Sequence, residues 1–178
     1  MANITEESVR KETLLETAKK IMTAARTAPK GRGIDTLSIS VVTGSELQQI
    51  IDKMKEIGKK EGSEFFIRDA ENLLASGILI LIGTQIAPTN LHYCGLCGFD
   101  NCSTKTNVPE APCAFNLLNL GIALGSAVSL AADLRVDNRI MYSAGKAAME
   151  IGIVDKNIKV CMGIPLSVTS KSPFFDRK

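Results

Sequence analysis

The chain has 178 residues, of which 45% are hydrophobic and 22% charged, a balance typical of a folded globular protein. Its formal net charge is only +2, and it has two tyrosines and no tryptophan. Nucleic-acid binding is not expected, because attraction to phosphate needs a basic patch and base stacking needs aromatic side chains. The length suits one ordinary domain, and we expect a single domain over residues 1–178.

The N-terminal part is predicted to be helical. Residues 1–7 are polar and lack the apolar core of a signal peptide, so we expect a cytoplasmic protein. Apolar residues recur at helical spacing from about Glu6 to Ala28, after the capping residue Thr5, and Pro29 ends the pattern. The basic turn Lys30-Gly31-Arg32-Gly33 follows. It could hold an anion through backbone N–H groups and its two cations, or be a solvated connection.

The middle of the chain alternates between predicted strands and helices. A strand is expected over 37–42, a helix over 45–60 and a further helix over 65–75. Residues 78–83 form a continuous apolar run of strand length, which indicates a strand covered on both faces. We expect this strand at the centre of the sheet.

A cysteine-rich loop is predicted at about 90–113, after this central strand. It holds four of the five cysteines, Cys94, Cys97, Cys102 and Cys113, spaced C-x2-C-x4-C-x10-C. Clustered thiols without a secretion signal indicate metal ligation rather than disulfides, since four thiolates can close a tetrahedral site or hold an iron–sulfur cluster. Gly95 and Gly98 each follow a cysteine, which lets the loop curl tightly around the sulfurs.

The spacing leaves three interpretations open. It lacks the two C-x2-4-C pairs of most zinc sites, and it is not a standard ferredoxin run. It is similar to the C-G-x-C-G-x-x-x-C stretch of small 4Fe-4S domains, so a 4Fe-4S cluster is the first choice, zinc the second and unligated thiols the third. His92 could donate a hydrogen bond to a sulfur or be a surface residue. Cys161 is expected in the core, on a strand.

The last third begins with a glycine-spaced helix, expected from about 111 to 135. Its start places Cys113 near the positive end of the helix dipole. Residues 114–132 carry no charge, but Asn116 and Asn119 interrupt them, so we expect a buried core helix and no membrane span. Gly121, Gly125 and Ser129 lie four apart and would let another helix approach, within the chain or across a dimer. A helix over 139–152 and a strand over 158–164 follow.

Several stretches carry a resemblance to known families. The cysteine motif, with Cys113-Ala-Phe, Leu120-Gly-Ile-Ala-Leu-Gly-Ser, Asp137-Asn-Arg-Ile-Met-Tyr and Gly163-Ile-Pro-Leu-Ser, resembles the uncharacterised prokaryotic ferredoxin domain-containing proteins. Ala24-Ala-Arg-Thr-Ala-Pro29, then a strand, then Gly44-Ser-Glu-Leu, is similar to the opening of the flavin-dependent nitroreductase fold, and Gly163-Ile-Pro165 is similar to its close.

The second resemblance implies the fold and a second cofactor. It implies an α+β fold, with a nitroreductase-like mixed central sheet flanked by long helices and the cysteine-rich loop inserted, and a homodimer paired through a long helix. It leaves FMN open as a cofactor. The Arg-x-Ser-x-Arg stretch with which nitroreductases hold the flavin phosphate is not found before the first helix, so Lys30, Arg32 and Lys171 are the expected phosphate contacts.

The functional expectation is a cytoplasmic iron–sulfur redox protein, either an electron carrier with an unidentified redox partner or a component of a flavin-linked reductase. No Ser/His/Asp set or nucleotide-binding glycine fingerprint supports hydrolysis or kinase chemistry. The alternative is a structural or interaction protein whose loop is held by zinc.

Overall fold

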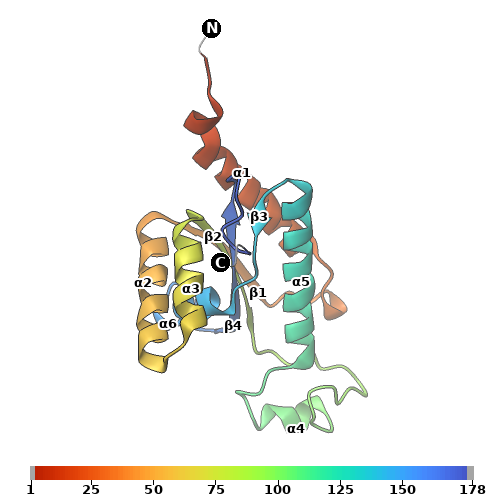
Figure 1. Cartoon of the computed structure of the whole chain (residues 1–178). Coiled ribbons are helices and arrows are strands. Elements are labelled where there is room, and N and C mark those ends of the chain that lie inside the picture. The colour runs from red at the N-terminus through yellow and green to blue at the C-terminus, as the bar shows by residue number, and fades with distance from the viewer. Residues whose placement is uncertain (1–2, 176–178) are drawn as a thin grey trace.

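The structure is a computed structural model that describes residues 3–175. Long helices lie on both sides of one four-stranded sheet (Figure 1). In chain order the elements are α1 (Glu6–Thr27), the short 3-10 helix η1 (Gly31–Gly33), β1 (Leu37–Thr43), α2 (Gly44–Glu61), α3 (Glu64–Leu74), β2 (Ile78–Gln85), α4 (Cys102–Thr106), α5 (Ala114–Asp133), β3 (Asp137–Asn138), α6 (Tyr142–Glu150) and β4 (Ile158–Ser167). The expected α+β architecture is confirmed.

The strand order is β1-β2-β4-β3, so β2 is an inner strand, as its apolar run predicted. Every pairing is antiparallel, where a mixed sheet was expected. The reason lies in the connection from β1 to β2. A single helix between two strands returns the chain for a parallel pairing, whereas the two successive helices α2 and α3 reverse it once more.

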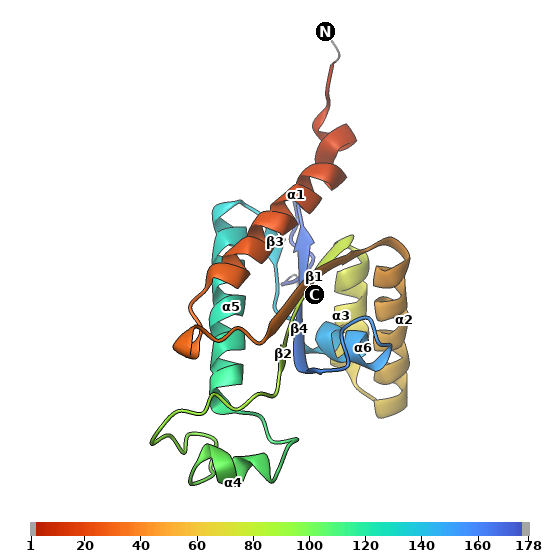
Figure 2. The same ribbon diagram turned by 180° about the vertical axis from the view of Figure 1, so that it is seen from behind.

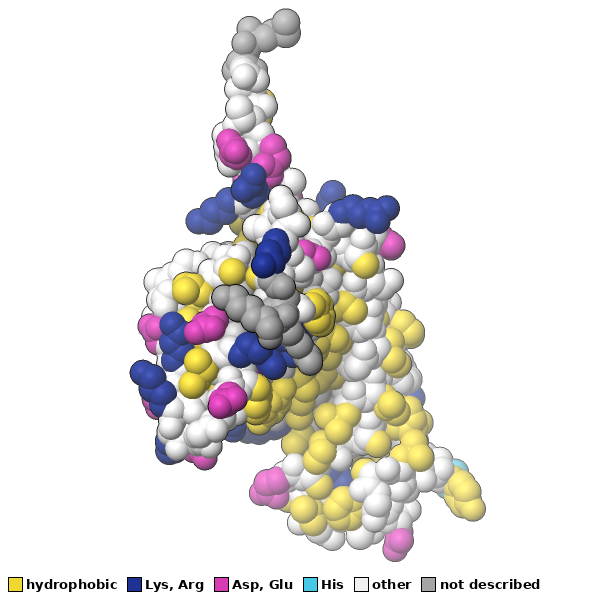
Figure 3. Space-filling view, in the orientation of Figure 1, with side chains coloured by type: hydrophobic (Ala, Val, Ile, Leu, Met, Phe, Trp, Pro, Cys, Tyr) yellow, Lys and Arg dark blue, Asp and Glu magenta, His cyan; other side chains and the backbone are white. Residues whose placement is uncertain are grey.

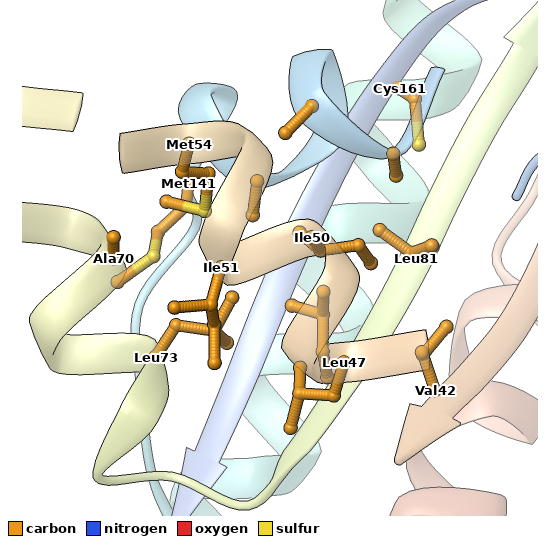
Figure 4. Packing of buried hydrophobic residues seen from close by; sticks show 14 of the residues in the cluster. Val42, Leu47, Ile50, Ile51, Met54, Ala70, Leu73, Leu81, Met141 and Cys161 are labelled. Carbon is orange, nitrogen blue, oxygen red and sulfur yellow. The ribbon is translucent and has the colours of Figure 1, made fainter. Parts of the chain in front are cut away.

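The two faces of the sheet bury separate hydrophobic clusters. Figure 2 shows α1 and α5 covering one face and α2, α3 and α6 the other. Side chains of β2 alternate between them, with Leu79 and Leu81 on the α2 side and Ile78, Ile80 and Ile82 on the α1 side. Figure 4 shows the cluster on the α2 side, in which Ile50 of α2 lies beside Leu81 of β2 and Met54 lies beside Met141.

Helix α5 is long and apolar enough to cross a membrane, but one face of it is built into the core. Ala123, Ala127 and Ala131 are fully buried against α1 and the sheet. Gly121, Gly125 and Ser129 lie on the other side and are exposed. One face of α5 therefore packs in the core, as the sequence predicted, while its glycine face is not covered by the described part of the chain.

Two short elements were not expected from the sequence. Strand β3 pairs Asp137 and Asn138 with the end of β4, and the predicted helix over 139–152 begins only after it, at Tyr142. Helix α4 forms inside the cysteine loop, where Asn101 accepts a hydrogen bond from the N–H of Thr104 and caps its first turn.

Candidate functional site

The cysteine loop, residues 86–113, leaves the end of β2 and returns to the start of α5. It forms a separate lobe beyond the sheet, with α4 at its far end (Figures 1 and 2). Gly95 and Gly98 adopt positive φ angles of 78° and 83°, a region that side chains with a Cβ rarely occupy. The glycines beside the first two cysteines are thus required by the backbone of the loop, as expected.

The two ends of the loop are held together at the start of α5. The side-chain oxygen of Asn116, on the first turn of α5, accepts a hydrogen bond of 2.9 Å from the N–H of Ala87. The Oγ1 atom of Thr89 lies 3.6 Å from Sγ of Cys113, 24 residues further along the chain. The loop therefore begins and ends at one place, which fixes Cys113 close to the segment that leads to the other three cysteines.

Cys113 is the buried member of the cysteine set. It is 5% exposed and occupies the N-cap position of α5, where the first N–H groups of the helix point toward it. Burial acts to raise the pKa of its thiol, but hydrogen bonds from Thr89 and from the backbone of Phe115 and Asn116 outweigh burial and lower that pKa. This environment favours the thiolate, which is the form that binds a metal.

Cys94, Cys97 and Cys102 lie on the loop as half-buried free thiols. Among residues 3–175, no three His, Cys, Asp or Glu side chains are grouped closely enough to hold a metal ion. The convergence of Cys94, Cys97, Cys102 and Cys113 on one site therefore stays a prediction. The donor set itself fits a tetrathiolate centre, since four uncombined thiols lie on one closed loop and at its foot.

The basic turn that follows α1 contacts the cysteine loop. Nη1 of Arg32 donates hydrogen bonds to the carbonyl oxygens of Thr89 (2.9 Å) and Asn90 (3.2 Å). The side-chain oxygen of Asn119 accepts a 2.9 Å hydrogen bond from the N–H of Gly31. The turn therefore lies against the start of the cysteine loop, although the anion site remains a prediction.

Lys30 and Arg32 differ in their capacity to bind an anion. The ammonium group of Lys30 donates to the carbonyl oxygens of Ala25, Arg26 and Ala28, which uses all three of its N–H groups at the end of α1. Arg32 is exposed and uses only Nη1, so its Nε and Nη2 donors remain for a ligand. A phosphate at this turn would therefore bind to Arg32.

A groove of about 630 Å³ opens beside the foot of the loop. It is lined by residues from the start of the loop, from its end next to Cys113, and from the beginning of β4: Gln85, Ile86, Pro109, Glu110, Pro112, Asn157, Lys159 and Val160. No pattern in the sequence indicates this groove, because its residues come from three separate segments.

The remaining sequence expectations concern single residues. His92 is exposed, and no described hydrogen bond joins its side chain to a sulfur. Cys161 is buried in β4, as expected, and burial raises the pKa of its thiol to about 12. Asn116 and Asn119 appeared in the sequence only as interruptions of an apolar helix. In the structure both side chains are buried. Asn119 accepts a hydrogen bond from the basic turn and Asn116 one from the start of the cysteine loop, so both segments are held against α5.

Comparison with known proteins identifies relatives in sequence. An uncharacterized protein from Archaeoglobus fulgidus is 45% identical over 161 residues, which is 86% of each chain. The model of a family described as "Uncharacterized protein containing a ferredoxin domain" (DUF2148) matches residues 110–177. That segment includes Cys113 but not the other three cysteines of the loop.

Solved structures share the fold at low sequence identity. A BluB-like flavoprotein from Clostridium difficile is 19% identical and has a TM-score of 0.59, and the match covers 99% of this chain and 84% of the flavoprotein. The FMN-dependent nitroreductase NfnB from Mycobacterium smegmatis, solved with NADPH, is 12% identical with a TM-score of 0.59, over 88% of this chain and 78% of the enzyme. The fold is therefore that of the nitroreductases. The extent of the archaeal match and the family model at the C-terminal side agree on the assignment, and the chain belongs to the family of uncharacterized proteins that contain a ferredoxin domain.

Proposed function

We propose that this chain is a cytoplasmic 4Fe-4S protein that transfers electrons, as a carrier or as the electron-donating part of a flavin-linked reductase. The observation that carries the proposal is the closed cysteine loop, with four free thiols, at the foot of α5 in a nitroreductase fold. Membership of the ferredoxin-domain family supports an iron–sulfur redox role.

Each thiol has a distinct part in this proposal. Cys94, Cys97 and Cys102 would ligate the cluster from the loop, and Cys113 would ligate it from the foot of α5. A bound cluster accepts and releases one electron at a time. The hydroxyl of Thr89 contacts the sulfur of Cys113. The side chain of Asn116 accepts a hydrogen bond from Ala87, which holds the start of the loop next to Cys113. The protein therefore fixes one ligand rigidly and leaves three on a loop that can close around the cluster.

The flavin-linked version of the proposal places an anionic group at the basic turn. Arg32 bonds to Thr89 and Asn90, so a phosphate on its free donors would lie beside the start of the cysteine loop. The structural neighbours include FMN-dependent nitroreductases, which supports FMN as the first flavin to test. Lys30 would act only indirectly, since its hydrogen bonds shape the turn.

A homodimer through α5 completes the proposal. Leu117, Leu118 and Ile122 are 40–52% exposed next to Gly121 and Gly125. Figure 3 shows hydrophobic side chains along the side of the molecule formed by α5. Exposed apolar residues beside glycines suit close packing of a second α5.

The test is chemical analysis of protein purified without oxygen. About four iron and four sulfide per chain, with a brown colour, would support the cluster. One zinc per chain and no colour would favour a zinc-held structural loop, and flavin released on denaturation would support the reductase version. Protein with neither iron nor zinc would contradict the proposal.

Serine variants assign the ligands. We expect Cys94→Ser, Cys97→Ser, Cys102→Ser and Cys113→Ser each to lose most of the bound iron, since serine replaces a thiolate ligand with a neutral hydroxyl. Cys161→Ala is the matched control, because Cys161 lies in β4 outside the loop. Full iron content in Cys113→Ser would remove the fourth ligand from the proposal.

A further inference from the structure

Two apolar side chains of the cysteine loop are exposed beside its first two thiols. Tyr93 directly precedes Cys94 and is 99% exposed. Leu96 lies between Cys94 and Cys97 and is 65% exposed. Within residues 3–175, the ring of Tyr93 makes no contact with another ring and no hydrogen bond. The single chain therefore leaves both side chains in water.

The backbone of Tyr93 adopts a conformation that is unfavourable for a bulky residue. Its φ angle is 58°, in the left-handed region, where asparagine, aspartate and glycine are far more common than tyrosine. Burial of the ring within the chain does not compensate for this cost, since the ring is exposed. Strained residues persist where a surrounding structure holds them, which points to a contact outside the single chain.

The exposed apolar surface of the loop continues onto α5. The side-chain oxygen of Asn116 accepts a hydrogen bond from Ala87, so the start of the loop lies against the first turn of α5. Figure 3 shows the only histidine, His92, at the outer tip of the lobe on the side of α5, next to hydrophobic side chains. The exposed apolar residues on the neighbouring turns of α5 are Leu117, Leu118 and Ile122.

This surface has no charged residue on either of its two segments. Residues 86–99 and 111–132 contain no Asp, Glu, Lys or Arg. Partners that meet transiently are usually recognised through charge, whereas homodimer interfaces are more apolar and poor in charge. A twofold dimer also places the same patch on both copies, so an uncharged apolar patch is matched by itself. These features favour a second copy of this chain as the partner.

We propose that Tyr93 and Leu96 pack against a second copy of the chain, so that each copy covers the metal–thiolate loop of the other. The inference rests on the proposed function, because it extends the dimer interface from α5 to the proposed cluster site. Cys94 and Cys97 are half-buried in the single chain, and the partner would exclude the remaining water from them. A dry shell around a metal site limits the access of solvent and oxidants.

Tyr93→Asn tests the contact. Asparagine tolerates the left-handed backbone, so the variant should fold at least as well as the unaltered chain. In sedimentation velocity, we expect the dissociation constant of the dimer to rise about 10-fold or more, since tyrosines often dominate interface energies. Leu96→Ser should weaken the dimer in the same direction. Leu74→Asn is the control, because Leu74 is 57% exposed at the end of α3, on the opposite face of the sheet, and should leave the dimer unchanged.

Metal retention measures whether the partner covers the site. Loaded protein is mixed with a chelator at concentrations above and below the dissociation constant of the dimer. The unaltered chain should lose metal several-fold faster after dilution, because monomers expose the loop. Tyr93→Asn should lose metal at the fast rate at both concentrations, and Leu74→Asn should behave like the unaltered chain.

The outcomes separate this inference from the proposed function. A chain without iron or zinc would overturn the proposed function, while sedimentation would still decide the contact at Tyr93. A dimer that is weakened by Gly125→Leu but not by Tyr93→Asn would overturn only this inference. Metal loss that does not depend on protein concentration would overturn the covering of the loop, and a chain that is always monomeric would overturn the inference as a whole.

Discussion

The five cysteines differ in how readily they should react. Cys161 is buried in β4 and burial raises the pKa of its thiol to about 12, so almost none of it is thiolate at neutral pH. Cys94, Cys97 and Cys102 are half-buried on the loop and accessible. Since alkylating reagents attack the thiolate, the folded metal-free chain should be modified at the loop cysteines and protected at Cys161.

Mass spectrometry after a brief treatment with iodoacetamide at pH 7.5 measures this difference. Unfolding in urea provides the control, because all five thiols should then react at similar rates. Metal-loaded protein should in addition protect the loop cysteines, since their thiolates are occupied. Modification of Cys161 in the folded chain as fast as Cys97 would contradict the placement of Cys161 in the core.

At the scale of single elements, the contact between α6 and β4 depends on one glycine. A Cβ atom at Gly145 would lie 2.0 Å from the carbonyl oxygen of Cys161, far inside contact distance. That oxygen belongs to the backbone of β4, which is held in place by its pairing with β2. Gly145→Ala should therefore force the helix from the sheet. We expect it to lower the free energy of unfolding by about 1–3 kcal/mol, as overpacking of cores typically does.

Urea denaturation followed by circular dichroism checks this, with Gln49→Ala in α2 as the control. Gln49 is exposed on α2, away from the proposed α5 interface, and alanine is the better helix former. The control should thus be as stable as the unaltered chain or more so. Equal stability of the two variants would show that α6 does not pack as closely on β4 as described.

The long periodic elements could be predicted from the sequence, and the contacts that build the site could not. Helix α2 has a regular apolar stripe and β2 a continuous apolar run, and both formed where expected. Strand β3 was missed because two residues carry no periodic signal and pair only through β4. The partners of Arg32, Asn116 and Asn119 are 29 to 88 residues away, a separation that periodicity does not report.

In the cysteine loop, too, the sequence predicts the local features but not the long-range packing. Its cysteines, glycines and approximate bounds could be read from spacing, because thiol clusters and glycines are rare enough to be informative. The low exposure of Lys105 on α4, 2%, could not, since a single lysine in a polar loop predicts an exposed side chain. It depends on how irregular chain wraps around α4, which no local pattern encodes.

The exposed glycine face of α5 predicts how two copies of the chain assemble. A Cβ added at Gly125 has no neighbour within 4 Å in the single chain. Gly125→Leu should therefore leave the folding of each chain intact. If two copies pair through α5, as we propose, leucine at this position would keep the helices apart and weaken the dimer.

Sedimentation velocity over a range of concentrations measures the result. We expect the unaltered chain to sediment as a dimer and Gly125→Leu as a monomer with an unchanged circular dichroism spectrum. Gln49→Leu adds the same side chain at an exposed position on α2, across the sheet from α5, and should stay dimeric. A dimer that survives Gly125→Leu would place the interface on another surface, and an unaltered chain that is monomeric at all concentrations would mean that the apolar face of α5 serves a different partner.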